Sequence, residues 1–419
     1  MLDILRRAIF GKAAGKNAGM NAPGKPAPAR SISGNAIGGR LLEAFTGSDA
    51  VASVAVVALG FLVATLILAV IGRNPVGMYE AIVQVVTGFD IRPGRGGWNP
   101  RHIGEWLVVS APLILCGLSM AFAARTGLFN IGAEGQYIVG LTAAQVIALS
   151  FPPVPVLHAV VSVGGAILAG AAWGGVVGFF KARYRVSEVV ATIMMNHIAL
   201  FLHRIVTLRL PGALPHRTPD FPETATLASP FLSSLTNGSR LNLGLWLTLA
   251  AIVVYWLVME KTRLGYSLRA TGLSRDAAHY AGINVKANIT AAMAVAGGFA
   301  GLAGAVVSLG VFSFGRVLAG FEGFGFEGIA VALVGNSTAW GAALAGLLFG
   351  MLRSAQPIMQ MRMIPREITS IIVGMVVIFI SLRAGLRLLI DWRLKEQARR
   401  AREREKDAAA EDGASGGGA

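Results

Sequence analysis

A carboxylate flanked by two amides opens one of the chain's long apolar runs. The segment reads Gly127-Leu-Phe-Asn-Ile-Gly-Ala-Glu-Gly-Gln136, and its polar side chains are those of Asn130, Glu134 and Gln136. Burying an ionised carboxylate in hydrocarbon costs roughly 3 kcal/mol even on a lenient scale, so Glu134 is expected to face the interior of a helix bundle. Two roles fit it: it lines a transport pathway, or it accepts hydrogen bonds from the backbone amides of a broken helix. The sequence leaves both open, and Asn130 and Gln136 are pathway residues or local hydrogen-bond partners.

A second glycine-rich segment carries two further carboxylates. It reads Gly320-Phe-Glu-Gly-Phe-Gly-Phe-Glu-Gly328, which places Glu322 and Glu327 at the head of a shortened apolar run. Glycine-interrupted apolar segments at matching positions of two halves of a membrane protein indicate a transport pathway. Asn196 lies in the middle of another apolar run and is added to this expected pathway, because polar groups inside a membrane face the protein interior.

A polar loop at residues 260–284 can hold a short helix. Ser274 is a suitable N-cap for a helical body over residues 275–281, and Gly282 is a suitable C-terminal stop. A short helix across the cytoplasmic face suits the docking of a partner, and the alternative is a solvated connector. We favour docking, because a plain connector does not need an ordered helix of small residues. The expected docking residues are Arg269, Gly272, Ser274, Ala277, Ala278 and Gly282.

The elements that must position these residues are membrane helices. Of the 419 residues, 54% are hydrophobic and only 14% are charged, against about 25% charged in soluble domains. A helix crosses the hydrocarbon with roughly 20 apolar residues. We therefore expect an all-α, polytopic membrane protein with about ten transmembrane helices. The apolar runs lie at residues 51–71, 103–123, 131–150, 157–180, 187–206, 243–259, 288–311, 324–338, 340–355 and 368–390.

The expected spans divide into two five-helix halves, residues 51–206 and 243–390, joined by a proline-rich external loop at 208–242. Because five is odd, equivalent helices of the two halves run in opposite directions, which makes an inverted repeat.

The transmembrane domain is expected over residues 51–392, with tails on both sides. Residues 1–50 read as a disordered basic tail and residues 393–419 as a charged tail. Lysine and arginine are concentrated in these tails and in alternate loops, which predicts that both termini are cytoplasmic.

The sequence argues against an enzyme. A P-loop pattern is absent, so any ATP is expected to be bound by a partner subunit. The single cysteine, Cys116, excludes a cysteine metal cluster, and the six histidines show no paired-ligand spacing. The net charge of +15 lies between the apolar runs and in the tails, which indicates membrane topology rather than nucleic-acid binding. No catalytic residue, metal or cofactor is expected.

Two segments carry a family resemblance. Residues 127–136 resemble the hallmark of permeases of the branched-chain amino acid/ribose type of ABC importer. The pattern Arg269-Ala-Thr-Gly-x4-Ala277-Ala278-x3-Gly282-Ile283 resembles their cytoplasmic coupling loop. The nucleoside (basic membrane protein-dependent) permeases are most similar. Ribose permeases carry an Asp-Leu-Ser type segment where this chain has Asn130-Ile-Gly. The resemblance covers residues 51–390.

The resemblance implies a transporter assembly in a bacterial inner or plasma membrane. It implies an all-α bundle paired with a second permease chain, identical or related, and two ATP-binding cassette ATPase subunits. A periplasmic or lipid-anchored binding protein would deliver a small polar solute, with nucleosides expected ahead of simple sugars or branched-chain amino acids. The ATPase would dock near residues 274–284.

Two other classes of protein are alternatives to the importer. A proton-coupled secondary transporter would use Glu134, Glu322 or Glu327, but it leaves the ordered cytoplasmic loop unexplained. A channel or scaffold subunit would be expected to show a ring-forming filter motif, and none is evident. Dependence of uptake on a partner ATPase discriminates between the importer and the proton-coupled transporter.

Overall fold

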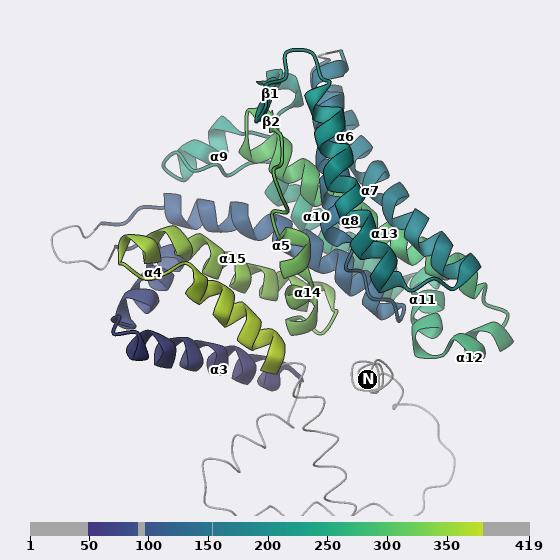
Figure 1. The fold of residues 1–419 in the computed structure, drawn as a ribbon, viewed down its shortest axis with the longest axis horizontal. Helices are drawn as coiled ribbons and strands as arrows, with labels where there is room; N and C mark the ends of the chain where they lie inside the picture. Colours follow the sequence, from purple (N-terminus) through teal and green to yellow (C-terminus); the bar gives the residue numbers. More distant parts are fainter. Residues whose placement is uncertain (1–48, 91–96, 153, 380–419) are drawn as a thin grey trace, which may run out of the picture. The chain divides into compact units, whose positions relative to one another are not determined.

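The computed structural model describes residues 49–90, 97–152 and 154–379 (Figure 1). Within these residues, seven helices are long and apolar enough to cross a membrane. They are α3 (Asp49–Val70), α5 (Arg101–Arg125), α7 (Leu157–Tyr184), α8 (Glu188–Leu208), α10 (Gly244–Trp256) with its π-helical extension η2 (Leu257–Lys261), α13 (Val285–Val311) and α15 (Ala339–Met361). The shorter apolar helices are α4 (Val76–Thr87), α14 (Phe324–Val334) and Glu367–Phe379, and α6 (Ala133–Ser150) is an 18-residue helix with several polar side chains.

A helix occupies each of the ten expected ranges, the last of them as far as residue 379. The mostly helical, polytopic membrane architecture is therefore confirmed, whereas the number of crossings and the two inverted halves stay predictions. Two further helices were not expected: α4, and α11 (Arg263–Leu273) in the polar loop. The predicted tails lie outside the described residues, apart from residues 49 and 50.

The expected external loop at 208–242 adds a small sheet to the helical fold. It contains β1 (Arg217–Asp220), η1 (Glu223–Ala225) and α9 (Pro230–Leu235). β1 pairs antiparallel with β2 (Phe314–Arg316), with Arg217 opposite Arg316. This pairing of two short segments far apart in the chain was not part of the all-α expectation.

Two compact units form the chain, residues 59–377 and residues 1–58 with 378–419, and the features below all lie in the first. Its central helix is α13, which packs against α7, α6 and α5. The packing with α7 is close enough that a methyl group on Gly170 would lie 2.8 Å from the Gly301 Cα. Small residues permit such backbone contact between membrane helices, where dispersion replaces the hydrophobic effect as the driving force.

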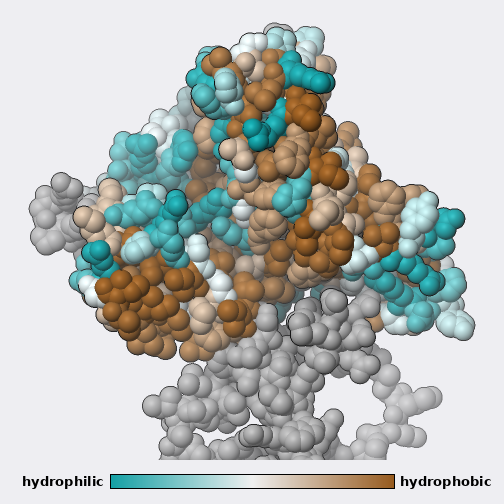
Figure 2. Space-filling model, viewed as in Figure 1, coloured by the Kyte–Doolittle hydropathy of each residue, from teal (hydrophilic) through white to brown (hydrophobic). Residues whose placement is uncertain are grey.

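Polar elements lie at the two ends of α13. The short helix α12 (Arg275–Tyr280) precedes it and β2 follows it (Figure 1). A helix of 27 residues is roughly 40 Å long, close to the thickness of a bilayer with its headgroups. Figure 2 shows hydrophobic residues over the face formed by α6, α7 and α8 and hydrophilic residues around α11 and α12. Leu168 on α7 and Phe201 and Ile205 on α8 are exposed apolar side chains, as expected for helices that contact lipid.

Candidate functional site

The two glycine-rich segments are breaks between helices. α5 ends at Arg125, the chain turns with Gly127 at φ 72°, and α6 begins at Ala133. In the same way α13 is followed by β2 and a loop, and Gly323 at φ 85° precedes α14. A positive φ favours glycine, which explains glycine at these two turns. Each break therefore brings the N-terminus of a new helix into the interior of the bundle.

Glu134 joins the two breaks. Its side chain is 0% exposed, and Oε1 accepts hydrogen bonds from the backbone amides of Glu322 at 2.9 Å and Gly323 at 2.8 Å. Oε2 accepts a third bond from the Gly325 amide at 2.7 Å. The N-terminal amides of α14 have no partner within their own helix, and a carboxylate is favoured there by the helix dipole as well. Of the two roles that the sequence left open, this geometry is that of a carboxylate that satisfies a broken helix.

Asn130, Gln136 and Asn196 serve the first break. Asn130 Nδ2 donates to Gln136 Oε1 at 2.9 Å and to Ser119 Oγ at 3.1 Å, and its Oδ1 accepts from the Gly132 amide at 3.1 Å. On α8, Asn196 Oδ1 accepts from the Gly135 amide at 2.8 Å, and Nδ2 donates to the Ile131 carbonyl at 3.1 Å. All three amides are buried, and Asn130 and Asn196 satisfy backbone groups of the break, while Gln136 holds the Asn130 side chain in place.

Glu322 lies in the loop before α14 and binds two side chains. Arg316 donates to its two carboxylate oxygens at 2.5 and 3.0 Å, and the Tyr137 hydroxyl donates to Oε2 at 2.5 Å. The pair is largely buried, with 20% of the Arg316 side chain and 17% of the Glu322 side chain exposed. Glu322 therefore connects β2, α6 and the second break.

Glu327, in the first turn of α14, pairs with a cation from α15. Arg353 donates to Glu327 Oε1 at 3.1 Å and to the Glu322 carbonyl at 2.9 Å. The Arg353 guanidinium carbon also lies 4.1 Å from the centroid of the Phe324 ring. Arg353 therefore binds both the loop that precedes α14 and the first turn of that helix.

The structure brings together Asn130, Glu134, Gln136, Glu322 and Asn196, and it places Glu327 on the neighbouring turn of α14. Sequence reasoning missed three of their partners: Tyr137, Arg316 and Arg353. Arg353 had a usable signal, because it is a lone charge within an apolar run and such charges mark interior or functional positions.

The predicted docking segment forms two helices in succession. Thr262 caps α11, and Ser274 caps α12 by accepting a hydrogen bond from the Ala277 amide at 3.2 Å. Gly282, at φ 78°, follows the end of α12. The predicted short helix is confirmed. Ala277 is exposed and Ala278 is buried, so α12 presents one face outward.

The docking segment contacts the first break directly. A methyl group on Gly127 would lie 3.1 Å from the Gly272 carbonyl oxygen, so the two loops meet backbone to backbone. Beside them Glu260, at the end of η2, forms ion pairs with both Arg125 at the end of α5 and Arg269 on α11. A displacement of α11 and α12 would therefore act on the backbone at the end of α5.

Long apolar helices, interrupted by polar glycine-rich breaks that meet inside the bundle, define a multi-pass membrane transport protein. The chain matches, over residues 102–381, the family described as the permease component of the branched-chain amino acid transport system, and it belongs to that family. The family predicted from the two motifs is thus confirmed.

Curated relatives are permeases by name. The chain is 39% identical over 317 residues to the guanosine ABC transporter permease protein NupP of Bacillus subtilis, with 74% of this chain and 91% of the relative covered. It is 35% identical over 341 residues to the nucleoside ABC transporter permease protein NupB of Lactococcus lactis, covering 79% and 90%. Identity to the ribose import permease protein RbsC of Escherichia coli is 28%, covering 51% and 63%. The relatives are transport components rather than enzymes.

Proposed function

We propose that this chain is the permease subunit of an ATP-driven importer that carries nucleosides across a bacterial inner or plasma membrane. The guanosine and nucleoside permeases cover 74% and 79% of the chain at 39% and 35% identity. The glucose ABC transporter permease protein TsgB13 of Haloferax volcanii covers 66% at 32% identity, and the ribose permease covers 51% at 28%. The chain itself would perform no catalysis and bind no cofactor. ATP would be bound and hydrolysed by a partner cassette subunit.

The observation that carries the proposal is the contact between the docking segment and the first break. The exposed helix α12 directly follows α11, whose Gly272 contacts the loop before α6. Glu260 forms ion pairs with Arg125 and Arg269 on the two sides of this contact. This arrangement suits an ATPase that docks on Arg269, Ser274, Ala277 and Gly282, which are exposed or partly exposed, and moves the broken helices through Gly272 and Ala278, which are buried beneath that surface. Movement of the broken helices would then open the pathway alternately to the two sides of the membrane.

The remaining parts of the assembly follow from the same proposal. A second permease chain, identical or related, would complete the pathway, and a periplasmic or lipid-anchored protein would deliver the solute. Both termini would be cytoplasmic, with ten spans in two inverted halves. The matching positions of the breaks support the repeat, because α5–α6 and α13–α14 each join the second and third helices of a predicted half.

The intramembrane carboxylates favour this importer over proton-coupled transport. Glu134 is held by three amides, Glu322 by Arg316 and Tyr137, and Glu327 by Arg353. A proton carrier must exchange its proton and its partners during the cycle, whereas each of these carboxylates is engaged with fixed hydrogen-bond or ion-pair partners.

The proposal is tested by uptake in proteoliposomes that contain the chain, its cognate ATPase and the binding protein. Labelled nucleosides, ribose and leucine are offered with and without ATP on the ATPase side. We expect ATP-dependent uptake of nucleosides alone. Uptake driven by a proton gradient without ATP, or confined to ribose or leucine, would contradict the proposal.

The docking role is tested by Ala277→Trp on the exposed face of α12. We expect loss of ATPase binding and uptake with normal membrane insertion. Ala69→Trp, at an exposed alanine of α3, is the matched control and should retain both. Wild-type uptake by the Ala277 variant would count against docking at α12.

A further inference from the structure

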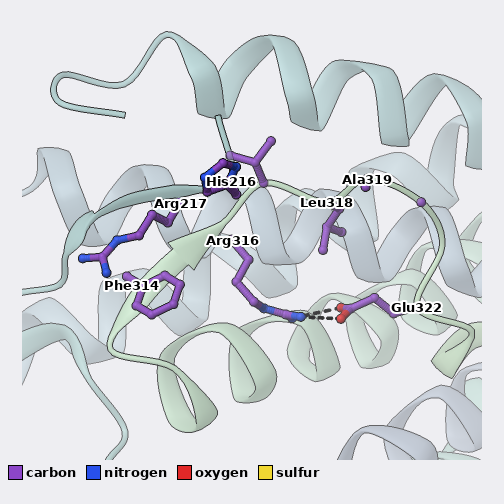
Figure 3. A pocket seen from close by; sticks show the side chains of 9 residues that line it. His216, Arg217, Phe314, Arg316, Leu318, Ala319 and Glu322 are labelled. Atoms are coloured by element: carbon purple, nitrogen blue, oxygen red, sulfur yellow. Dashed lines mark hydrogen bonds and ion pairs between the residues drawn. The ribbon is translucent and has the colours of Figure 1, made fainter. Parts of the chain in front are cut away.

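A cavity of about 480 Å³ lies between β1 and the segment that runs from β2 to α14 (Figure 3). Small-molecule sites typically occupy roughly 300–1,000 Å³. The wall includes the side chains of His216, Arg217, Phe314, Arg316, Leu318 and Glu322. Because β2 and α12 lie at opposite ends of α13, the cavity opens on the side away from the proposed ATPase, which is the side from which an importer receives its solute.

One wall of the cavity is aromatic. The Arg217 guanidinium carbon lies 4.5 Å from the centroid of the Phe314 ring, and Arg217 is ion-paired with Asp220 at 3.0 Å. Planar heterocyclic bases stack on aromatic rings and on guanidinium planes. This wall therefore offers a base a flat surface to stack on, and the charge of the arginine in it is already balanced by Asp220.

Beside the aromatic wall the cavity is polar. Figure 3 shows Arg316 and Glu322 pointing toward one another, and two hydrogen bonds of 2.5 and 3.0 Å join them. Arg316 Nε is buried and has no hydrogen-bond partner among the residues that the structure describes. This nitrogen is enclosed by protein, so the polar group that the wall offers a ligand is the Glu322 carboxylate, which can accept hydrogen bonds from hydroxyl or ring N–H groups.

We propose that this cavity is the permease's own binding site for a nucleoside, with the base against Phe314 and Arg217 and the ribose at Arg316 and Glu322. The inference rests on the proposed function and names a site within it. Both arginines are already paired with carboxylates, so the site favours a neutral nucleoside over a nucleotide, whose phosphate needs an unpaired cation. The aromatic wall favours a nucleoside over a free sugar.

Occupancy of this site is communicated to the breaks through Glu322. Its side chain faces the cavity, while its backbone amide is bonded to Glu134 Oε1 at 2.9 Å. The loop that runs from β2 to α14 is anchored by a hydrogen bond of 3.1 Å from the Leu318 amide to His203 Nε2. A solute that competes for Glu322 therefore acts on the residue that also binds the head of α14.

Photolabelling tests the site. The whole importer in nanodiscs is irradiated with azido-guanosine, digested and analysed by mass spectrometry. We expect label in the peptide that contains residues 312–322, and protection by excess guanosine but not by guanosine monophosphate or ribose at equal concentration. Phe314→Ala should reduce this label about tenfold, because stacking contributes that order of affinity per base. Phe231→Ala, at a Phe that is 73% exposed on α9, is the matched control and should retain the label.

Phe314→Leu keeps apolar volume without a ring and is the second variant if the alanine variant does not assemble; it should lose label as strongly. Full labelling of a Phe314 variant, label that is confined to other peptides, or equal protection by the monophosphate overturns the inference. Uptake by the wild-type importer is measured in parallel. Normal nucleoside uptake without protected label refutes this site alone, whereas absence of nucleoside uptake by the wild type refutes the proposed function.

Discussion

Replacing Glu134 by glutamine tests whether this residue holds the two breaks together. Its two oxygens accept three backbone amides at 2.7–2.9 Å within the bundle. Glutamine has almost the same shape, but its amide group cannot accept from Gly325 if its oxygen accepts from Glu322 and Gly323. The change therefore converts the bonds from Glu322 and Gly323 from charge-assisted to neutral. At the third position the glutamine NH2 group would face the Gly325 N–H, and two donors cannot form a hydrogen bond with each other.

The size of the effect follows from these contacts. Hydrogen bonds to charged groups contribute about 1.5–3 kcal/mol each and neutral ones about half as much, while a neutral amide costs less to bury. We expect Glu134→Gln to lower the free energy of unfolding by about 2–4 kcal/mol. Glu134→Ala leaves all three amides without an acceptor, and at about 1–3 kcal/mol each it should lower the free energy by more, up to about 9 kcal/mol.

The assay is denaturation of the purified chain in mixed micelles, followed by circular dichroism, together with ATP-dependent uptake. Glu367→Gln is the control, because that carboxylate is 65% exposed and contacts only its neighbour Arg366 among the described residues. Equal stability of wild type and Glu134→Gln, or an alanine variant no less stable than the glutamine variant, would refute the capping role.

Three further predictions concern the contacts around this centre. Glu260→Gln should change stability by less than about 1 kcal/mol, because exposed ion pairs contribute little, yet it should lower solute transported per ATP by freeing Arg125 and Arg269; an unchanged ratio excludes this link. Gly325→Ala should destabilise the fold and abolish uptake, because the new methyl would lie 2.7 Å from the Ala133 carbonyl carbon; a variant with wild-type stability and uptake contradicts the close approach. Tyr137→Phe removes a 2.5 Å hydrogen bond to Glu322 and should lower the free energy of unfolding by about 1.5–3 kcal/mol; unaltered denaturation would show that the hydroxyl contributes nothing.

The helices could be predicted wherever apolar residues run long enough to cross a bilayer. α4 was missed because its 12 residues are too few for a span. α11 was missed because its charged, weakly patterned sequence reads as a connector, although Thr262 supplies a cap. β1 and β2 are four and three residues long and pair across a large separation in the chain, so no local periodicity predicts them.

The candidate site also contains residues that could be predicted from the sequence and residues that could not. Asn130, Glu134 and Gln136 lie within seven residues of one another, and a carboxylate among glycines before an apolar run is visible in sequence. Their partners come from distant helices, and which residue faces them depends on helix rotation. Arg316 could not be assigned to Glu322 from sequence, because only the strand pairing with β1 fixes where it points.

The contacts that connect the two ends of the bundle differ in kind: some are made by backbone groups and others by side chains. At the docking end, Gly127 and Gly272 meet through their backbones, with no side chain between them. In the interior, Glu134 binds backbone amides of the second break rather than side chains. At the cavity, Glu322 relies on side chains that can exchange partners. Backbone contacts followed by an exchangeable side-chain contact suit the proposed transporter, in which a docked ATPase would move both breaks while the solute would compete only at the last contact.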